Sequence, residues 1–265
     1  MILLNNKQIE IKKFPNGESF LNIEDLVLQE INEIKLKFEN DEDITHLIFL
    51  KGHLDDLAAK TKLTIGYLPY SRMDRTEGMR VFTLKYFTRL INSMNFESVE
   101  IYEPHSDVGT ALLDRVRVVN MSAELGIEVL KEVQNEVRAT YIVYPDTGAA
   151  KRYSKQIKYN KILTANKERD FQTGNITSLE INGTIEDSDF DAIIIDDLCS
   201  KGGTFMMTAE KLKEMGAKYI YLVVTHCEDT IFQGDVLKSD LITRIYTTNS
   251  ILTKEDNKIQ VKKII

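Results

Sequence analysis

The sequence predicts an α/β fold in which parallel sheets are flanked by helices. Short apolar runs of strand length alternate with segments of helical period along most of the 265 residues. Nearly continuous apolar runs are typical of parallel strands buried on both faces, and their alternation with helices is typical of α/β proteins. The order strand, charged turn, helix occurs in both parts of the chain, which indicates two similar α/β units.

The individual elements follow from these runs. The predicted strands are THLIFL (45–50), LTIGYL (63–68), SVEIYE (98–103), ATYIVY (139–144), KILTA (161–165), DAIIID (191–196) and YIYLVVT (219–225). Residues 82–94 and 204–216 place apolar side chains at helical spacing, and Gly216 is suited to end the second helix. A strand–turn–helix pattern restarts within residues 124–138, so we expect one domain over 1–137 and a second over 138–265.

The composition argues against several classes of binding partner. The formal net charge is −7, so a broad attraction to nucleic acid or to an anionic membrane is not expected. Cys199 and Cys227 lack metal-type spacing and are typical of a reduced cytosolic chain. The N-terminus does not resemble a signal peptide, and no apolar run approaches the roughly 18 residues of a membrane span. We expect a cytoplasmic protein, in the host cytoplasm if a phage encodes it.

Charged or glycine-containing turns follow four of the predicted strands. They are YSRMDR (70–75), EPHSDV (103–108), PDTGAAKR (145–152) and DDLCSKGGT (196–204). In open parallel sheets, ligands bind beyond the carboxyl ends of the strands, where loops and helix N-termini converge. The four turns together predict a ligand site at that edge.

The turn DDLCSKGGT combines groups suited to a sugar and to a phosphate. Asp196 and Asp197 can accept hydrogen bonds from adjacent sugar hydroxyls. The loop then enters a helix, whose free N–H groups and dipole attract an anion, while Gly202 and Gly203 allow close approach to the backbone. This pattern predicts a ribose 5-phosphate site, and a capped helix start with solvated aspartates is the alternative.

The same turn carries a family resemblance. IIIDDLCSKGGTF (193–205) resembles the ribose-phosphate-binding loop of type I phosphoribosyltransferases and of ribose-phosphate pyrophosphokinases, also called PRPP synthetases. Segments that resemble the synthetases follow in family order: FPNGES (14–19), YLPYSRMDR (67–75), YEPHSDV (102–108), YPDTGAAKR (144–152) and ANKERD (165–170). The resemblance implies two phosphoribosyltransferase-like domains, with ATP-binding elements in 1–137 and the ribose-phosphate loop in 138–265.

The resemblance also implies a reaction. The family transfers the β,γ-diphosphoryl group of ATP to the C1 hydroxyl of a ribose phosphate, with Mg²⁺ as cofactor. Lys167 and Arg169 would clamp the moving group, and their spacing on a strand predicts one shared face. Arg80 follows in a segment resembling the family's mobile catalytic loop. His105 and Asp146 would ligate the Mg²⁺ carried by ATP, a metal that needs few protein ligands.

The resemblance also implies two sets of binding residues. The ATP-binding set is Arg72, Asp74, Arg75, His105, Phe14, Asn16 and Glu18. The ribose-phosphate set is Asp196, Asp197, Ser200, Lys201, Gly202, Gly203 and Thr204. Phe14, Asn16 and Glu18 match positions that reach the adenine in a neighbouring subunit, which implies a homo-oligomer that is at least a dimer.

The phosphate-binding loop departs from the family pattern D-[ST]-[AG]-G-T. Ser200 replaces the aspartate and Lys201 the threonine, so one negative charge is lost and one positive charge is gained. The added cation favours a more negative acceptor, such as the diphosphate of ADP-ribose, which some phage-type relatives pyrophosphorylate to rebuild NAD. Ribose 5-phosphate and ADP-ribose both stay open as acceptors.

The motifs also bear on two alternative functions. A non-catalytic regulatory homologue would not need both the basic pair and the metal ligands. A phosphoribosyltransferase that uses PRPP as donor would not need the turns YSRMDR and EPHSDV.

Overall fold

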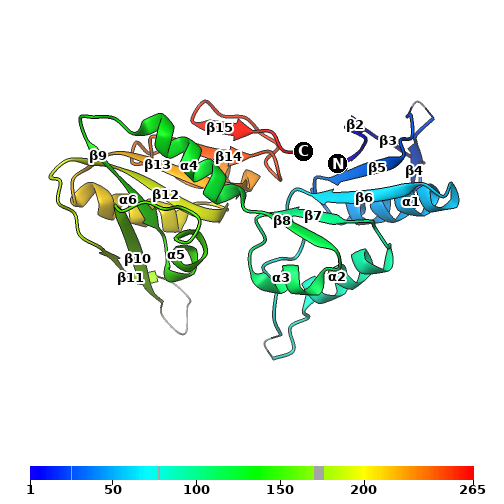
Figure 1. Ribbon diagram of the computed structural model, residues 1–265, viewed down its shortest axis with the longest axis horizontal. Helices are drawn as coiled ribbons and strands as arrows, with labels where there is room; N and C mark the ends of the chain where they lie inside the picture. Colours follow the sequence, from blue (N-terminus) through cyan, green and yellow to red (C-terminus); the bar gives the residue numbers. More distant parts are fainter. Residues whose placement is uncertain (25, 77, 170–175) are drawn as a thin grey trace. The chain divides into compact units, whose positions relative to one another are not determined.

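The computed structural model describes residues 1–24, 26–76, 78–169 and 176–265, and the side chains of residues 167–169, 176 and 177 lie outside this description. The chain divides into two compact units. The first comprises Met1–Val119 with Ile264–Ile265, and the second comprises Asn120–Lys263. Each unit contains an open sheet with flanking helices, so the predicted α/β class is confirmed (Figure 1).

The first unit contains a six-stranded mixed sheet. Its strands, in spatial order, are β2 (Lys7–Gln8), β1 (Ile2–Leu4), β5 (Ile31–Leu36), β6 (Lys60–Ile65), β7 (Val99–Tyr102) and β8 (Val116–Val119). Strands β5 to β8 are parallel, and β1 is antiparallel to both of its neighbours. A separate antiparallel hairpin joins β3 (Glu10–Lys13) to β4 (Ser19–Asn22). The helices are α1 (Glu42–Asp56), α2 (Thr83–Ser93) and α3 (Asp107–Leu112).

The strand predicted over 45–50 is wrong, because these residues lie in α1. Leu47, Leu50 and Leu54 recur at helical spacing and are all buried in the core of the unit. Ile48 and Phe49, which made the run look continuous, are 40% and 52% exposed. A short apolar run fits a strand and a buried helix equally well, and packing decides between them.

The second unit contains a seven-stranded sheet. Its spatial order is β11 (Ile176–Asn182), β10 (Ile162–Arg169), β9 (Ala139–Tyr144), β12 (Phe190–Cys199), β13 (Ala217–Cys227), β14 (Arg244–Thr248) and β15 (Ile259–Lys262). Only the pair β10–β11 is antiparallel among the ladders of the described residues in this sheet. The predicted strands 139–144, 161–165, 191–196 and 219–225 all fall on these elements.

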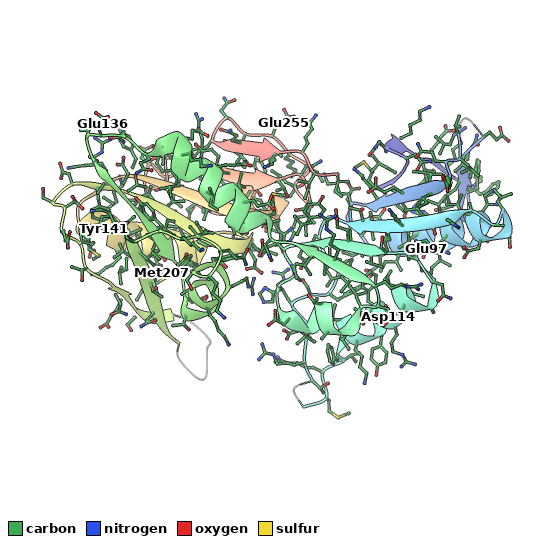
Figure 2. All side chains as sticks on the ribbon, in the orientation of Figure 1. Glu97, Asp114, Glu136, Tyr141, Met207 and Glu255 are labelled. Carbon is green, nitrogen blue, oxygen red and sulfur yellow. The ribbon has the colours of Figure 1, made fainter. Side chains whose placement is uncertain are left out.

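Helices cover both faces of this sheet, as the continuous apolar runs predict. Ile193 and Ile195 of β12 join a core cluster with α4 (Met121–Val133) and α5 (Thr147–Tyr153). Ile194, between them, faces the opposite side and joins a cluster with α6 (Gly203–Glu214). Tyr141 of β9, labelled in Figure 2, belongs to the second cluster, and its ring centroid lies 5.1 Å from that of Phe190.

The compact units divide earlier than the predicted boundary at 137/138. Helix α4 belongs to the second unit, since Leu125 and Val129 pack in its core. A Cβ atom on Gly126 would lie 2.7 Å from Cδ1 of Ile195, so the helix lies directly against β12. The amphipathic pattern of a helix shows that one face is buried, but it does not show which sheet buries it.

The helices of the described ranges are all too short or too polar to cross a lipid bilayer. Helix α6 ends as its sequence predicts. Gly216 follows its last turn with φ 107°, and its N–H donates to the carbonyl of Lys213 at 3.1 Å. A Cβ atom there would lie 2.4 Å from the carbonyl oxygen of Ser188, a backbone atom that cannot swing away.

We therefore expect Gly216→Ala to destabilise the protein by about 1–3 kcal/mol, through the left-handed φ and the backbone clash. Gly52 is the matched control, because it lies in α1 and a Cβ atom there would meet nothing within 4 Å. Gly52→Ala should instead stabilise the protein by about 0.5–1 kcal/mol, the gain of alanine over glycine in a helix. Urea denaturation measures both, and equal effects would contradict this account of the helix end.

Candidate functional site

The two adjacent aspartates lie inside β12, although the sequence places them at the end of a strand. β12 stays paired with β13 as far as Cys199, whereas its pairing with β9 ends at Ile194. Asp196 and Asp197 therefore follow the point at which one neighbouring strand has ended. The N–H of Asp197 donates to Oδ1 of Asp196 at 2.9 Å. The carboxylates thus lie at the carboxyl edge of the sheet, as predicted.

Burial controls the protonation of this pair. Asp197 is 6% exposed and Asp196 is half-buried. Burial, the charge and hydrogen bonding of Asp197, and the charge of Asp146 hold the pKa of Asp196 well above its ordinary value. Nη1 of Arg152 lies 3.5 Å from Oδ2 of Asp197 and supplies a positive charge to it. Burial and the neighbouring carboxyl groups therefore oppose ionisation of Asp196, whereas Asp197 has a cation beside it.

Arg152 is a site residue that the sequence prediction left out. It lies in the last turn of α5, and Asp146 caps the start of the same helix by accepting from the N–H of Ala149 at 2.9 Å. One short helix therefore positions a predicted metal ligand and the cation beside Asp197. The signal was present in the sequence, because Arg152 is the basic residue that ends the turn PDTGAAKR.

The segment that leads from β12 into the first turn of α6 (residues 200–204, the SKGGT loop) has the geometry of an anion site. Gly202 adopts φ 82°, ψ 11° at the start of α6, where no side chain caps the helix. A Cβ atom on Gly202 would lie 2.1 Å from Cγ2 of Val236, whereas one on Gly203 would meet nothing within 4 Å. Lys201 is exposed on the loop, and Thr204 lies in the first turn of the helix. The uncapped N–H groups and the lysine can together bind an anion.

Residues after β13 support this loop, and the sequence prediction did not include them. The hydroxyl of Ser200 lies 3.0 Å from that of Thr230, which donates to Oε2 of Glu228 at 2.9 Å. The N–H of Glu228 donates to the carbonyl of Cys199 at 2.8 Å. A Cβ atom on Gly234 would lie 2.1 Å from the carbonyl oxygen of Lys201, so this segment packs closely beneath the loop.

In the first unit, predicted ATP-binding residues line one small cavity. Its volume is about 250 Å³, and its lining residues are Arg72, Met73, Asp74, Arg75 and Arg80. Asp74 is 8% exposed, and it accepts a hydrogen bond from Nε of Arg75 at 3.1 Å. Three of the five lining residues are arginines, and guanidinium groups are suited to bind a polyphosphate.

The turn after β7 lies beside this cavity. Burial opposes ionisation of Asp74, but Ser106, Arg75 and His105 outweigh it and hold the pKa of Asp74 below its ordinary value. The structure thus brings Asp74 and His105 together, because their turns follow the adjacent parallel strands β6 and β7. Both turns hold strained backbone, since Tyr70 and Glu103 adopt φ 63° and 39°. Such strain costs about 1–3 kcal/mol for a residue and is concentrated at functional sites.

Phe14, Asn16 and Glu18 meet at the tip of the β3–β4 hairpin. Nδ2 of Asn16 donates to Oε2 of Glu18 at 2.8 Å, and the ring of Phe14 is 52% exposed. Phe14 and Glu18 line a different cavity, of about 460 Å³, together with residues of α1. The predicted ATP-binding set is therefore divided between two places on the first unit.

The remaining predicted residues are the catalytic pair and the metal ligands. Lys167 and Arg169 lie on β10, whose register with β11 shifts between Glu168 and Arg169, but their side chains fall outside the described residues. His105 belongs to the first unit and Asp146 to the second. Within the described ranges, no three His, Cys, Asp or Glu side chains gather as a metal centre.

Comparisons with known proteins give this geometry a context. Residues 178–265 match the family model described as the phosphoribosyl synthetase-associated domain. The ribose-phosphate pyrophosphokinase of Sulfurisphaera tokodaii is 30% identical over 92% of this chain and 84% of its own length. That of Sulfolobus acidocaldarius is 29% identical over the same shares of the two chains.

A solved structure supports the fold. The crystal structure of phosphoribosylpyrophosphate synthetase from Mycobacterium smegmatis covers 97% of this chain and 86% of its own, with a TM-score of 0.72 at 16% identity. The predicted pair of phosphoribosyltransferase-like α/β domains is confirmed by this likeness. Taken with the identity to the curated relatives over nearly the whole length, these observations show that the chain belongs to the ribose-phosphate pyrophosphokinase family.

Proposed function

We propose that this protein transfers the β,γ-diphosphoryl group of ATP to the C1 hydroxyl of a ribose 5-phosphate-type acceptor and releases AMP. The observation that carries this proposal is the aspartate pair of β12 followed directly by the uncapped start of α6. An ionised carboxylate accepts from sugar hydroxyls, and the helix start binds the phosphate on the same molecule. Family membership supports the same assignment.

On the acceptor side, Asp197 would accept hydrogen bonds from the hydroxyls of the sugar. Its ion pair with Arg152 holds the carboxylate in place, while burial and the charges of Asp197 and Asp146 raise the pKa of Asp196 and oppose its ionisation. The 5-phosphate then binds the backbone N–H groups at Gly203 and Thr204, with Lys201 as the nearby cation. This arrangement would orient the C1 hydroxyl and leave Lys167 and Arg169 to bind the diphosphoryl group.

On the nucleotide side, the cavity of Arg72, Arg75 and Arg80 would hold the triphosphate through charge-assisted hydrogen bonds. Asp74 keeps its charge because Ser106, Arg75 and His105 stabilise it, and it in turn orients Arg75. We assign His105 and Asp146 as ligands of the Mg²⁺ carried by ATP from the family match of their turns, and a metal that retains several waters needs few protein ligands. When bound, Mg²⁺ neutralises charge on the phosphoryl oxygens.

The transfer step itself would depend on Lys167 and Arg169. Negative charge is spread over the phosphoryl oxygens in the transition state, so fixed cations supply most of the stabilisation. We assign both residues this role from the match of ANKERD to the family's catalytic strand. The exposed ring of Phe14 supports the further proposal that the hairpin reaches the adenine in a second copy of the chain.

Two acceptors fit the SKGGT loop. Ribose 5-phosphate needs only the helix start, whereas ADP-ribose carries a diphosphate that would also use Lys201. The exposure of Lys201 favours such a role, because its ammonium is not buried in the fold. A phosphoribosyltransferase is less well supported, since it would not need the arginine-lined cavity or the turn of His105. A non-catalytic homologue is less well supported because it would not need the basic pair Lys167 and Arg169.

The first test incubates the protein with ATP, Mg²⁺ and each acceptor, and measures AMP release. We expect Lys167→Ala to lower turnover about 10²–10³-fold with little change in acceptor affinity, the loss typical of one transition-state cation. Lys211→Ala is the control, because Lys211 is exposed on α6 and pairs with Glu214. Wild-type turnover in Lys167→Ala would remove this residue from the mechanism, and no AMP release by wild type with either acceptor would refute the function.

The second prediction separates the acceptors. Lys201→Thr should raise the KM for ADP-ribose about tenfold more than that for ribose 5-phosphate, the loss expected for one charge-assisted hydrogen bond. Lys211→Thr makes the same change of charge outside the loop and should alter neither KM. Equal effects of Lys201→Thr on the KM of both acceptors would show that Lys201 does not bind the diphosphate of ADP-ribose.

The third prediction concerns Asp196. Because folded Asp196 holds its proton to a higher pH than the unfolded chain does, wild-type stability should fall as pH rises from about 4 through the folded-state pKa. Asp196→Asn should remove this fall and raise Tm at neutral pH by about 2–4 °C, equivalent to about 1 kcal/mol. Acceptor affinity should fall at the same time, because an amide replaces an acid at the diol.

Asp114→Asn is the control for this substitution, since Asp114 is exposed in the first unit (Figure 2). It should leave both Tm and acceptor affinity unchanged. Thermal unfolding at several pH values gives the stability, and calorimetry with ribose 5-phosphate gives the affinity. A lower Tm for Asp196→Asn at neutral pH would show that the carboxyl group stabilises the fold.

A further inference from the structure

Three side chains of the second unit form a hydrogen-bonded chain that ends at the SKGGT loop. The hydroxyl of Ser200 lies 3.0 Å from that of Thr230, and Oγ1 of Thr230 lies 2.9 Å from Oε2 of Glu228. Ser200 follows β12, whereas Glu228 and Thr230 follow the neighbouring strand β13. The bond from the N–H of Glu228 to the carbonyl of Cys199 fixes the two segments side by side.

The carboxylate fixes the direction of every bond in this chain. An ionised carboxylate only accepts hydrogen bonds, so Thr230 must donate its single hydroxyl proton to Glu228. Thr230 can then only accept from Ser200, which must donate in the remaining bond. The one hydroxyl proton of Ser200 is thereby used inside the protein, and its oxygen presents only lone pairs to a ligand.

This direction decides what Ser200 can bind. A phosphate oxygen at Oγ of Ser200 would meet lone pairs rather than a proton, so the side chain adds nothing to anion binding. A sugar hydroxyl is a donor and forms a favourable bond with the same oxygen. The anion is left to groups that do donate, namely the N–H groups at the start of α6 and the ammonium of Lys201.

We propose that Glu228, acting through Thr230, makes Ser200 an acceptor for a hydroxyl of the ribose-type substrate and not a ligand of its phosphate. Glu228 and Thr230 are positioning residues in this scheme, because neither contacts the substrate. The inference rests on the proposed function, since it states which group of that acceptor meets Ser200. An accepting Ser200 beside a phosphate-binding helix start makes the loop selective for a sugar that carries both a free hydroxyl and a phosphate.

Calorimetry with two probes, inorganic phosphate and ribose 5-phosphate, tests the proposal without an activity assay. Ser200→Ala should weaken ribose 5-phosphate about tenfold and leave the affinity for phosphate unchanged or higher. Thr230→Val should weaken ribose 5-phosphate and strengthen phosphate about threefold to tenfold, because the freed proton of Ser200 can then donate to an anion. Thr230→Ser keeps the hydroxyl and should keep the wild-type ratio of the two affinities.

The opposite changes in affinity for the two probes distinguish this proposal from a purely structural role of Thr230. A loop that merely loosened would bind both probes more weakly, and that result in Thr230→Val would overturn the inference. A tenfold loss of phosphate affinity in Ser200→Ala would also overturn it, because the hydroxyl would then be a phosphate donor. If wild type binds neither probe, the proposed function fails, whereas binding of both with the wrong signs refutes only the role of Ser200.

Discussion

The central residues of strand β12 are buried on both faces of the sheet, and this packing keeps charged side chains out of the middle of the strand. Ile193 and Ile195 pack against α4 and α5, while Ile194 packs against α6, so no polar side chain fits in this stretch. The pairing of β12 with β9 ends at Ile194, and the carboxylates of Asp196 and Asp197 follow directly after Ile195. Apolar packing and chemistry are thus assigned to successive segments of one strand, which is the arrangement that parallel sheets favour.

Burial also opposes the ionisation of carboxylates. The two units differ in the groups that offset this effect. In the second unit, Asp197 is paired with Arg152, and Asp196 is left with a raised pKa. In the first unit, Asp74 stays charged because its polar and cationic neighbours outweigh its burial. Buried carboxylates whose neighbours push their pKa values in different directions are typical of sites that bind and transfer charged groups.

Part of the fold and of the site was accessible from sequence because it depends on local pattern. The run of β9, the end of α6 at Gly216 and the SKGGT loop are each specified within a few consecutive residues. The wrong strand prediction came where two structures share one sequence pattern. The apolar run at 45–50 fits a strand or a helix, and α4 fits either unit until its packing partner is known.

What the sequence determined by itself was the class of fold, the order of the motifs and the chemical types of the groups at each turn. Tertiary structure alone decided which carboxyl group has a raised pKa and in which direction the hydroxyl of Ser200 donates. Those properties depend on burial and on partners distant along the chain, such as Arg152 for Asp197 and Glu228 for Ser200 through Thr230. A hydrogen bond has a direction only when all its neighbours are in place, and a linear sequence does not contain that information.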